Sequence, residues 1–160
     1  MALDWLRDYL SIDSSTPAGA EEAAAYLRDV LHRHGIATRW LVSPEGRPSL
    51  YARLDPEEEV TETVVLLHHA DVVPPGSGWT QEPFEAAIVD GTIYGRGAVD
   101  DKSLGIAHLW TFIEASKKRS KLTRGLVFLT VTDEETGGAQ GSGWLVENHP
   151  ELFQRVTAVL

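Results

Sequence analysis

The sequence contains no cysteine, and this absence removes several kinds of chemistry at once. Without thiols the chain can form no disulfide, no thiolate zinc site and no cysteine nucleophile. Cations are also scarce, because 14 lysines and arginines stand against 24 aspartates and glutamates, giving a formal charge of −10. Such a charge repels the phosphates of nucleic acids, so we expect no nucleic-acid partner.

Long apolar runs are missing as well. No stretch of the sequence approaches the roughly 20 apolar residues that a membrane span requires. Asp4, Arg7 and Asp8 fall within the first turns of the chain, a pattern unlike that of a secretory signal. We therefore expect no membrane partner and a cytoplasmic location. The 160 residues suit one domain, which can bury roughly 70% of its unfolded surface.

The apolar residues of the chain follow two kinds of pattern, one typical of buried strands and one typical of helices. Continuous apolar runs at 63–68 and 126–131 predict strands that are covered on both faces. Apolar residues at helical spacing over 21–34, and a dense apolar segment over 103–116, predict helices. Weaker patterns predict an opening helical segment, strands at 36–42 and 49–54, a hairpin at 86–94 turning at 90–91, a helix at 143–148 and a strand from 156. This order predicts an α/β fold whose sheet is parallel or mixed.

Side chains of the types that bind metal ions lie at three turns between these elements. His69 and Asp71 follow one apolar strand, residues 133–135 (Asp-Glu-Glu) follow another, and residues 100–101 (Asp-Asp) precede a buried helix. Sites in open α/β sheets form beyond the carboxyl ends of the strands. Crossover connections between neighbouring strands would bring all three turns to one edge, where they would form a single site.

The spacing of His69 and Asp71 has a specific use. Residues two apart in an extended chain project to the same side. A carboxylate there can accept the second ring N–H of a metal-ligating imidazole, which fixes its tautomer. His68 is the neighbouring candidate, and we prefer His69 because of its spacing to Asp71. The alternative is a histidine that is merely hydrogen-bonded at the end of a strand.

The acidic residues at 133–135 and 100–101 also have ordinary structural interpretations. Residues 133–135 could begin a helix, although the glycines that follow make a poor helix start, and residues 100–101 could cap the helix near Ser103. In the functional interpretation, one aspartate bridges two cations about 3.5–4 Å apart. Of two neighbouring carboxylates, one then ligates a metal ion and the other transfers protons. Gly95-Arg96-Gly97 is not a phosphate loop, since a third glycine and a Walker lysine are absent.

Two longer stretches resemble the co-catalytic zinc peptidase and deacylase family, which includes acetylornithine deacetylase, succinyl-diaminopimelate desuccinylase, the aminoacylases and glutamate-releasing carboxypeptidases. They read LLHHADVVPPGSGWTQEPFEAAIVDGTIYGRGAVDDKS over 66–103 and FLTVTDEETGGAQGSGWLVENHPELF over 128–153. The combination of His-x-Asp-Val-Val-Pro, Tyr-Gly-Arg-Gly-x-x-Asp-Asp-Lys and Asp-Glu-Glu is highly specific. The VENHPELF segment is similar to the carboxypeptidase-like and N-acyl-amino-acid-cleaving branches.

The resemblance implies a three-layer α/β/α zinc-peptidase-like catalytic domain with a mixed, mainly parallel sheet. It implies that His69 ligates one metal ion, Glu135 the other, and Asp100 bridges both. Glu134 would be the general base, and Asp71 would orient His69. The implied cofactors are two divalent metal ions, zinc first, with cobalt or manganese as alternatives. The implied substrate is a peptide or an N-acyl amino acid. A cis peptide bond between Asp100 and Asp101 is implied too.

The resemblance further implies that residues 1–160 form a truncated, N-terminal portion of the catalytic domain. The remaining ligands, the lid or dimerisation domain and the C-terminal catalytic segment would lie beyond Leu160, and a homodimer would belong to the full-length protein. A catalytic zinc usually has three protein ligands. Each ion would here be one ligand short, so we expect weak metal binding and little hydrolase activity from this chain alone. A non-catalytic binding or assembly module and a related dizinc aminopeptidase are the alternatives.

Overall fold

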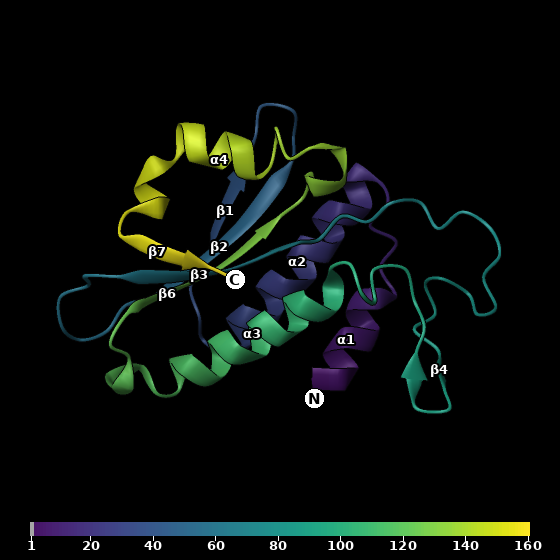
Figure 1. Ribbon diagram of the computed structural model, residues 1–160, viewed down its shortest axis with the longest axis horizontal. Coiled ribbons are helices and arrows are strands. Elements are labelled where there is room, and N and C mark those ends of the chain that lie inside the picture. The colour runs from purple at the N-terminus through teal and green to yellow at the C-terminus, as the bar shows by residue number, and fades with distance from the viewer. Residues whose placement is uncertain (1) are drawn as a thin grey trace.

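A mixed sheet lies between two layers of helices in the computed structural model, which describes residues 2–160 (Figure 1). Helices α1, α2 and α3 cover one face of the sheet, and α4 covers the other. The helices are α1 (Ala2–Leu10), α2 (Pro17–Arg33), α3 (Lys102–Ser116) and α4 (Ser142–Asn148), with the short 3-10 helices η1 (Arg119–Lys121), η2 (Glu134–Thr136) and η3 (Pro150–Phe153). The strands are β1 (Arg39–Val42), β2 (Pro48–Leu54), β3 (Thr63–His69), β4 (Ile88–Val89), β5 (Thr92–Ile93), β6 (Gly125–Val131) and β7 (Val156–Val159). The three-layer α/β/α architecture is therefore confirmed.

The five strands of the main sheet have the order β1-β2-β6-β3-β7. Strand β3 pairs in parallel with β6 and β7, whereas β2 pairs in antiparallel fashion with β1 and β6. The sheet is mixed as expected, but within residues 2–160 parallel and antiparallel pairings are equally frequent. The short turn between β1 and β2 accounts for one of the two antiparallel pairings, because a tight turn can join only antiparallel neighbours. His69 pairs with Val131, so β3 and β6 end at the same edge of the sheet.

Both faces of the central strands are buried, which explains their continuous apolar sequences. Phe128 of β6 packs with Leu109 and Phe112 of α3 in the core beneath α1–α3. Val127, on the opposite face of β6, packs with Leu145 of α4 in a second core. The carboxyl ends of β3 and β6 thus stand on a part of the sheet that is buried on both faces.

Helix α2 begins four residues before the predicted position. Thr16 is its N-cap, accepting a hydrogen bond from the Gly19 N–H at 3.2 Å, and Pro17 occupies the first helical position. At the other end, Gly35 has φ +72 as the helix terminator, and the Ile36 N–H donates to the Leu31 carbonyl. Ile36 therefore belongs to the helix cap and not to the following strand, which begins at Arg39.

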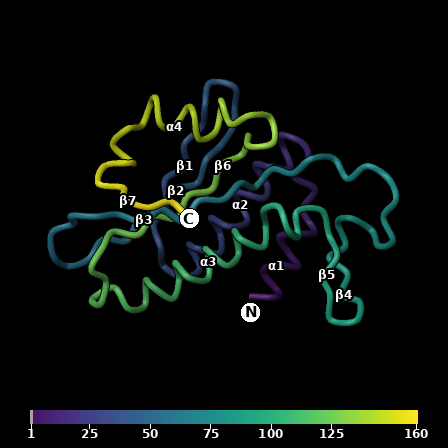
Figure 2. The backbone as a smooth tube through the Cα atoms, viewed as in Figure 1, coloured from purple at the N-terminus to yellow at the C-terminus, as the bar shows by residue number. Residues whose placement is uncertain are grey.

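The predicted hairpin at 86–94 is confirmed. Strands β4 and β5 pair around Asp90 and Gly91, both of which have positive φ, as a tight hairpin turn requires. Figure 2 shows this hairpin extending away from the main sheet. Across residues 2–160, none of the helices combines the length and apolar character needed to cross a bilayer.

Candidate metal centre

Three segments that are distant in sequence converge beyond the carboxyl ends of β3 and β6. One ligand atom from each of His69, Asp100 and Glu135 lies within 4.8 Å of the others. His69 is the last residue of β3, Asp100 lies two residues before α3, and Glu135 lies in η2 just after β6. The structure thus brings together the three residues that the resemblance implied as metal ligands.

The His69 ring is fixed by contacts at both of its nitrogen atoms. Nδ1 lies 2.9 Å from the carbonyl oxygen of Asp71, and Nε2 lies 2.9 Å from Oδ1 of Asp100. A carbonyl oxygen can only accept, so Nδ1 carries a proton in this contact and Nε2 faces the cluster. The spacing of His69 and Asp71 predicts the Asp71 carboxylate in this role, but its Oδ1 atom is 3.7 Å from Nδ1. The Asp71 backbone therefore makes the orienting hydrogen bond.

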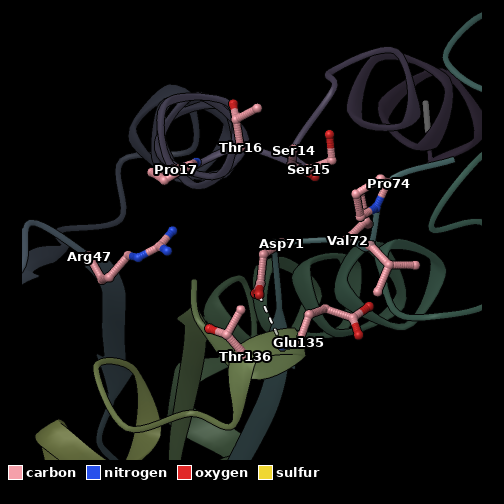
Figure 3. Close-up of a pocket in the computed structure, with 11 residues that line it drawn as sticks. Ser14, Ser15, Thr16, Pro17, Arg47, Asp71, Val72, Pro74, Glu135 and Thr136 are labelled. Atoms are coloured by element: carbon pink, nitrogen blue, oxygen red, sulfur yellow. Dashed lines mark hydrogen bonds between the residues drawn. The ribbon is translucent and has the colours of Figure 1, made fainter.

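The Asp71 carboxylate is used elsewhere, which explains this difference. Its Oδ2 atom accepts the backbone N–H of Glu135 at 3.1 Å, shown as the dashed line in Figure 3. Burial opposes ionisation of Asp71, but its contacts with His69 and the Glu135 N–H outweigh burial and lower its pKa. Asp71 therefore connects the end of β3 to the turn that carries Glu135.

The acidic surroundings strongly favour the charged form of His69. Burial opposes protonation, but the contacts with Asp71 and Asp100 outweigh it and raise the pKa of the imidazole to about 10. In the metal-free protein His69 is therefore an imidazolium at neutral pH. A metal ion that binds Nε2 has to displace this proton, so metal binding is coupled to proton release.

Glu134 lies beside the cluster without joining it. Its Oε2 atom is 3.8 Å from Nε2 of His69, and its side chain is 58% exposed. The Asp100 side chain is 76% exposed, so both carboxylates are open to solvent above the sheet edge. A carboxylate placed next to the cluster, but outside it, is free to accept and release protons.

The peptide bond between Asp100 and Asp101 is cis, as the resemblance implied. Asp101 is the N-cap residue of α3, but its side chain makes no capping hydrogen bond. Its Oδ2 atom instead accepts the backbone N–H of His69 at 3.4 Å. The helix-cap alternative for this pair is therefore only partly right, because the second aspartate supports the strand that carries His69.

Asp133 has a structural role in the same region. Its carboxylate accepts from Thr136 Oγ1 at 2.5 Å and from the Gln140 N–H at 2.8 Å. These bonds close the short turn η2, after which Gly137 adopts φ +102 and ends it. The helix-start alternative for residues 133–135 thus applies to a single 3-10 turn, which places Glu134 and Glu135 at the cluster.

His68 belongs to the core. Its ring is packed against Phe128 and Tyr9, at centroid distances of 5.3 and 6.5 Å, and the residue is 2% exposed. Burial lowers its pKa to about 3, so it is neutral. Adjacent strand residues point to opposite faces of the sheet, which separates His68 from the cluster reached by His69.

Sequence reasoning missed three residues near the cluster. Arg47 and Ser14 line a cavity of about 130 Å³, together with Asp71 and Glu135. Lys102 is fully buried, and its Nζ atom donates to the carbonyl groups at positions 9 and 12. A turn sequence around Arg47 gives no signal of a cavity. Lys102 did carry a signal, since it directly follows the motif that supplies Asp100.

The donor atoms of the cluster suit a divalent metal ion. Imidazole nitrogen and carboxylate oxygen are ligands that zinc accepts at about 2.0–2.2 Å. One imidazole nitrogen and two carboxylates within 4.8 Å of one another can surround such an ion after small side-chain movements. His69 is already oriented by the Asp71 carbonyl group, as metal-binding histidines commonly are. The residues present therefore fit a metal site.

Comparisons with known proteins agree with this geometry. Residues 65–160 match the family model described as Peptidase family M20/M25/M40. The chain belongs to this family, whose members among the matched proteins include a dinuclear metal-binding peptidase from Bacillus subtilis.

Individual relatives support the same placement. The chain is 38% identical over 142 residues to succinyl-diaminopimelate desuccinylase of Gluconacetobacter diazotrophicus, covering 86% of this chain and 36% of the relative. A metallo-carboxypeptidase of this family from Sulfolobus solfataricus has a TM-score of 0.79 at 27% identity, covering 98% of this chain and 36% of that one. Human carnosine dipeptidase 1 shares the fold, with a TM-score of 0.79, 23% identity and coverage of 99% and 37%. The chain spans about a third of the length of the relatives it matches.

Proposed function

We propose that this chain supplies part of the active site of a metal-dependent hydrolase that cleaves the amide bond of a peptide or an N-acyl amino acid. The observation that carries this proposal is the convergence of His69, Asp100 and Glu135 within 4.8 Å. The relatives named above include a desuccinylase and peptidases, and hydrolysis of an amide bond is the chemistry that they share.

Each residue has a distinct proposed role. His69 and Glu135 would each hold one divalent ion, zinc in preference to cobalt or manganese, and Asp100 would bridge the pair. When bound, the ions would supply Lewis-acid chemistry at the scissile carbonyl group. Asp71 would hold His69 in the required tautomer through its backbone carbonyl group, and would steady the turn that carries Glu135.

Glu134 would move the proton. It is close to the cluster and exposed, so its carboxylate can take a proton from the attacking water molecule. The same group would then deliver that proton to the leaving amine nitrogen. The two transfers return Glu134 to its ionised form, as a general base that is reused in each turnover must be.

Residues 1–160 would be the N-terminal portion of the catalytic domain in this proposal. Counted from this chain, one ion has His69 and Asp100 as ligands, and the other has Asp100 and Glu135. Since catalytic zinc usually has three protein ligands, each ion would need a further residue from outside the chain. We also propose that the longer protein is cytoplasmic and that it forms a homodimer.

Zinc titration by calorimetry tests the site directly. We expect weak zinc binding by the 160-residue chain, abolished by Asp100→Asn and unaffected by Asp90→Asn, which alters an aspartate in the β4–β5 turn. Tight binding of two ions would contradict the ligand count, and equal binding by both variants would remove the cluster from consideration.

The role of Glu134 requires an enzyme that carries the additional ligands. There, Glu134→Ala should abolish turnover while leaving the zinc content near two ions per chain, as measured by elemental analysis. Loss of metal from this variant, with retention in Glu135→Ala, would mean that the roles of the two glutamates are exchanged.

A further inference from the structure

Lys102 is a buried lysine whose amino group is used inside the protein. The residue is 0% exposed, and its Nζ atom donates to the Tyr9 carbonyl group at 2.9 Å and to the Ile12 carbonyl group at 2.7 Å. Both acceptors lie at or just beyond the C-terminal end of α1, where carbonyl groups lack partners within the helix. A buried amino group is unfavourable unless it is hydrogen-bonded, and these two bonds satisfy it. Lys102 thus attaches the first residue of α3 to the end of α1.

The turn that carries Asp100 closes on the Lys102 side chain. The Lys102 N–H donates to the Gly97 carbonyl group at 3.0 Å, so residues 97–102 form a closed turn with Asp100 inside it. A Cβ atom at Gly97 would lie 3.2 Å from Cδ and 3.3 Å from Cγ of Lys102. On its other side that atom would lie 2.9 Å from Cγ1 of Val72. The turn therefore packs directly on the lysine stem, and its position follows that of Lys102.

The Asp100 carboxylate depends on this turn for its direction. Its side chain is 76% exposed, and its Oδ1 atom contacts Nε2 of His69 at 2.9 Å. That contact joins two of the proposed metal ligands to each other. It cannot persist when a metal ion is bound, because a ligating imidazole nitrogen has to lose its proton. In the metal-bound protein, the backbone of the turn then decides where the Asp100 carboxylate points.

Asp101 also supports the turn, on the side of β3. Its Oδ2 atom accepts the His69 N–H at 3.4 Å, which is long for a hydrogen bond of this type. The two bonds made by Lys102 on the side of α1 are both shorter than this. The stronger attachment of the turn to the rest of the protein is therefore the one made by Lys102.

We propose that Lys102 is a positioning residue of the metal centre and that it acts through Asp100. By binding the end of α1, it fixes the turn at 97–102 so that the Asp100 carboxylate faces both His69 and Glu135. The inference rests on the proposed function, and it adds Lys102 and the first helix of the chain to the parts that determine metal affinity. Groups that orient metal ligands from behind typically change metal affinity by about 10–100-fold.

Cysteine chemistry can remove the Lys102 nitrogen atom without changing the size of the side chain. The chain has no cysteine of its own, so Lys102→Cys supplies a single thiol, which can be alkylated in urea before refolding. Bromoethylamine restores a side chain of the length of lysine that ends in an amino group. Propyl bromide gives the same length ending in a methyl group. Zinc titration of the two products, followed through the NMR signals of the His69 ring, compares their affinities.

The two products should differ in zinc affinity. The aminoethylated protein should bind zinc within about twofold of the wild type, and the propylated protein at least about tenfold more weakly. Without metal, the amide proton of residue 102 should exchange with solvent faster in the propylated protein, relative to the amide proton of Leu109 in the middle of α3. Equal zinc affinity in the two products would overturn the inference.

Two variants separate positioning from a general loss of stability. Ile113 is buried in the same helix, roughly 16 Å along its axis from Lys102, so Ile113→Ala destabilises α3 without touching the turn. Its zinc affinity should stay within about twofold of the wild type, and a loss as large as that of the propylated protein would mean that Lys102 acts only on the fold. Lys102→Met needs no alkylation and should bind zinc as weakly as the propylated protein. Wild-type affinity in Lys102→Met would overturn the inference even if the alkylated chains fail to refold.

Failure of this inference and failure of the proposed function give different results. If no form of the chain binds zinc, the metal centre is rejected together with every residue proposed to position it. If the wild type binds zinc through Asp100 and the two alkylated products bind it equally well, only the role of Lys102 is rejected.

Discussion

Replacing Gly105 by alanine should destabilise the protein, even though alanine is the better helix former. Gly105 lies inside α3, where alanine is favoured over glycine by about 0.8–1 kcal/mol. A Cβ atom at this position would lie 2.4 Å from Cδ2 and 2.6 Å from Nε2 of the His68 ring. The ring has little room to move away, because it is packed against Phe128 and Tyr9.

The size of the effect follows from these two opposing contributions. Overpacking a tight core costs about 1–3 kcal/mol, and contacts this short justify the upper value. Subtracting the gain in helix propensity leaves a loss of about 2 kcal/mol in the free energy of unfolding. For a domain of this size, the melting temperature should fall by about 4–8 °C.

Urea denaturation followed by tryptophan fluorescence measures this loss, and a double-mutant cycle identifies its cause. In a His68→Ala background the ring is absent, so the same Gly105→Ala substitution should increase stability by up to about 1 kcal/mol. The reasoning is refuted if Gly105→Ala stabilises the wild type, or if it costs the same in both backgrounds.

Two further predictions concern buried polar groups. Lys102→Met should lower the free energy of unfolding by about 2 kcal/mol, because the buried carbonyl groups of Tyr9 and Ile12 lose their donor; the exposed Lys117→Met should change it by less than about 0.5 kcal/mol in the same denaturation assay. Stability should fall as pH decreases from about 6.5 toward 3, since burial lowers the pKa of His68 to about 3 while the unfolded chain protonates this residue near 6.5. The slope of unfolding free energy against pH should be smaller in His68→Gln by up to about 1.4 kcal/mol per pH unit, and an unchanged slope would show that His68 is not the group responsible.

The elements that place the cluster could be predicted from the sequence because their signals are local. The continuous apolar runs that become β3 and β6 identify buried strands, and the polar residues directly after them mark the edge of the sheet. The start of α2 is also marked locally by Thr16 and Pro17, a capping residue followed by a proline. The equal share of antiparallel pairing depends on which strand lies beside β2, and that is decided by long-range packing.

The cavity could not be predicted, because its parts meet only in the folded chain. Arg47 belongs to the turn before β2, whereas Ser14 lies between α1 and α2. Their neighbouring positions depend on the antiparallel register of β2 with β6, which brings Pro48 to the edge where Asp133 follows Val131. Turn composition accounts for the path of the chain at Arg47, but it contains no information about the element that lies across from it.

A small set of hydrogen bonds fixes the cluster and the cavity together. Lys102 follows the aspartate pair and binds the carbonyl groups at positions 9 and 12, so it attaches the start of α3 to the segment that leads to Ser14. The Val72 N–H binds the Ser14 carbonyl group and attaches the same segment to the residues after β3. Asp71, next to Val72, contacts both His69 and the Glu135 N–H. Because these bonds form one connected chain, the position of the cavity wall at Ser14 relative to the proposed metal ligands is set jointly by backbone groups and by the side chains of Lys102 and Asp71.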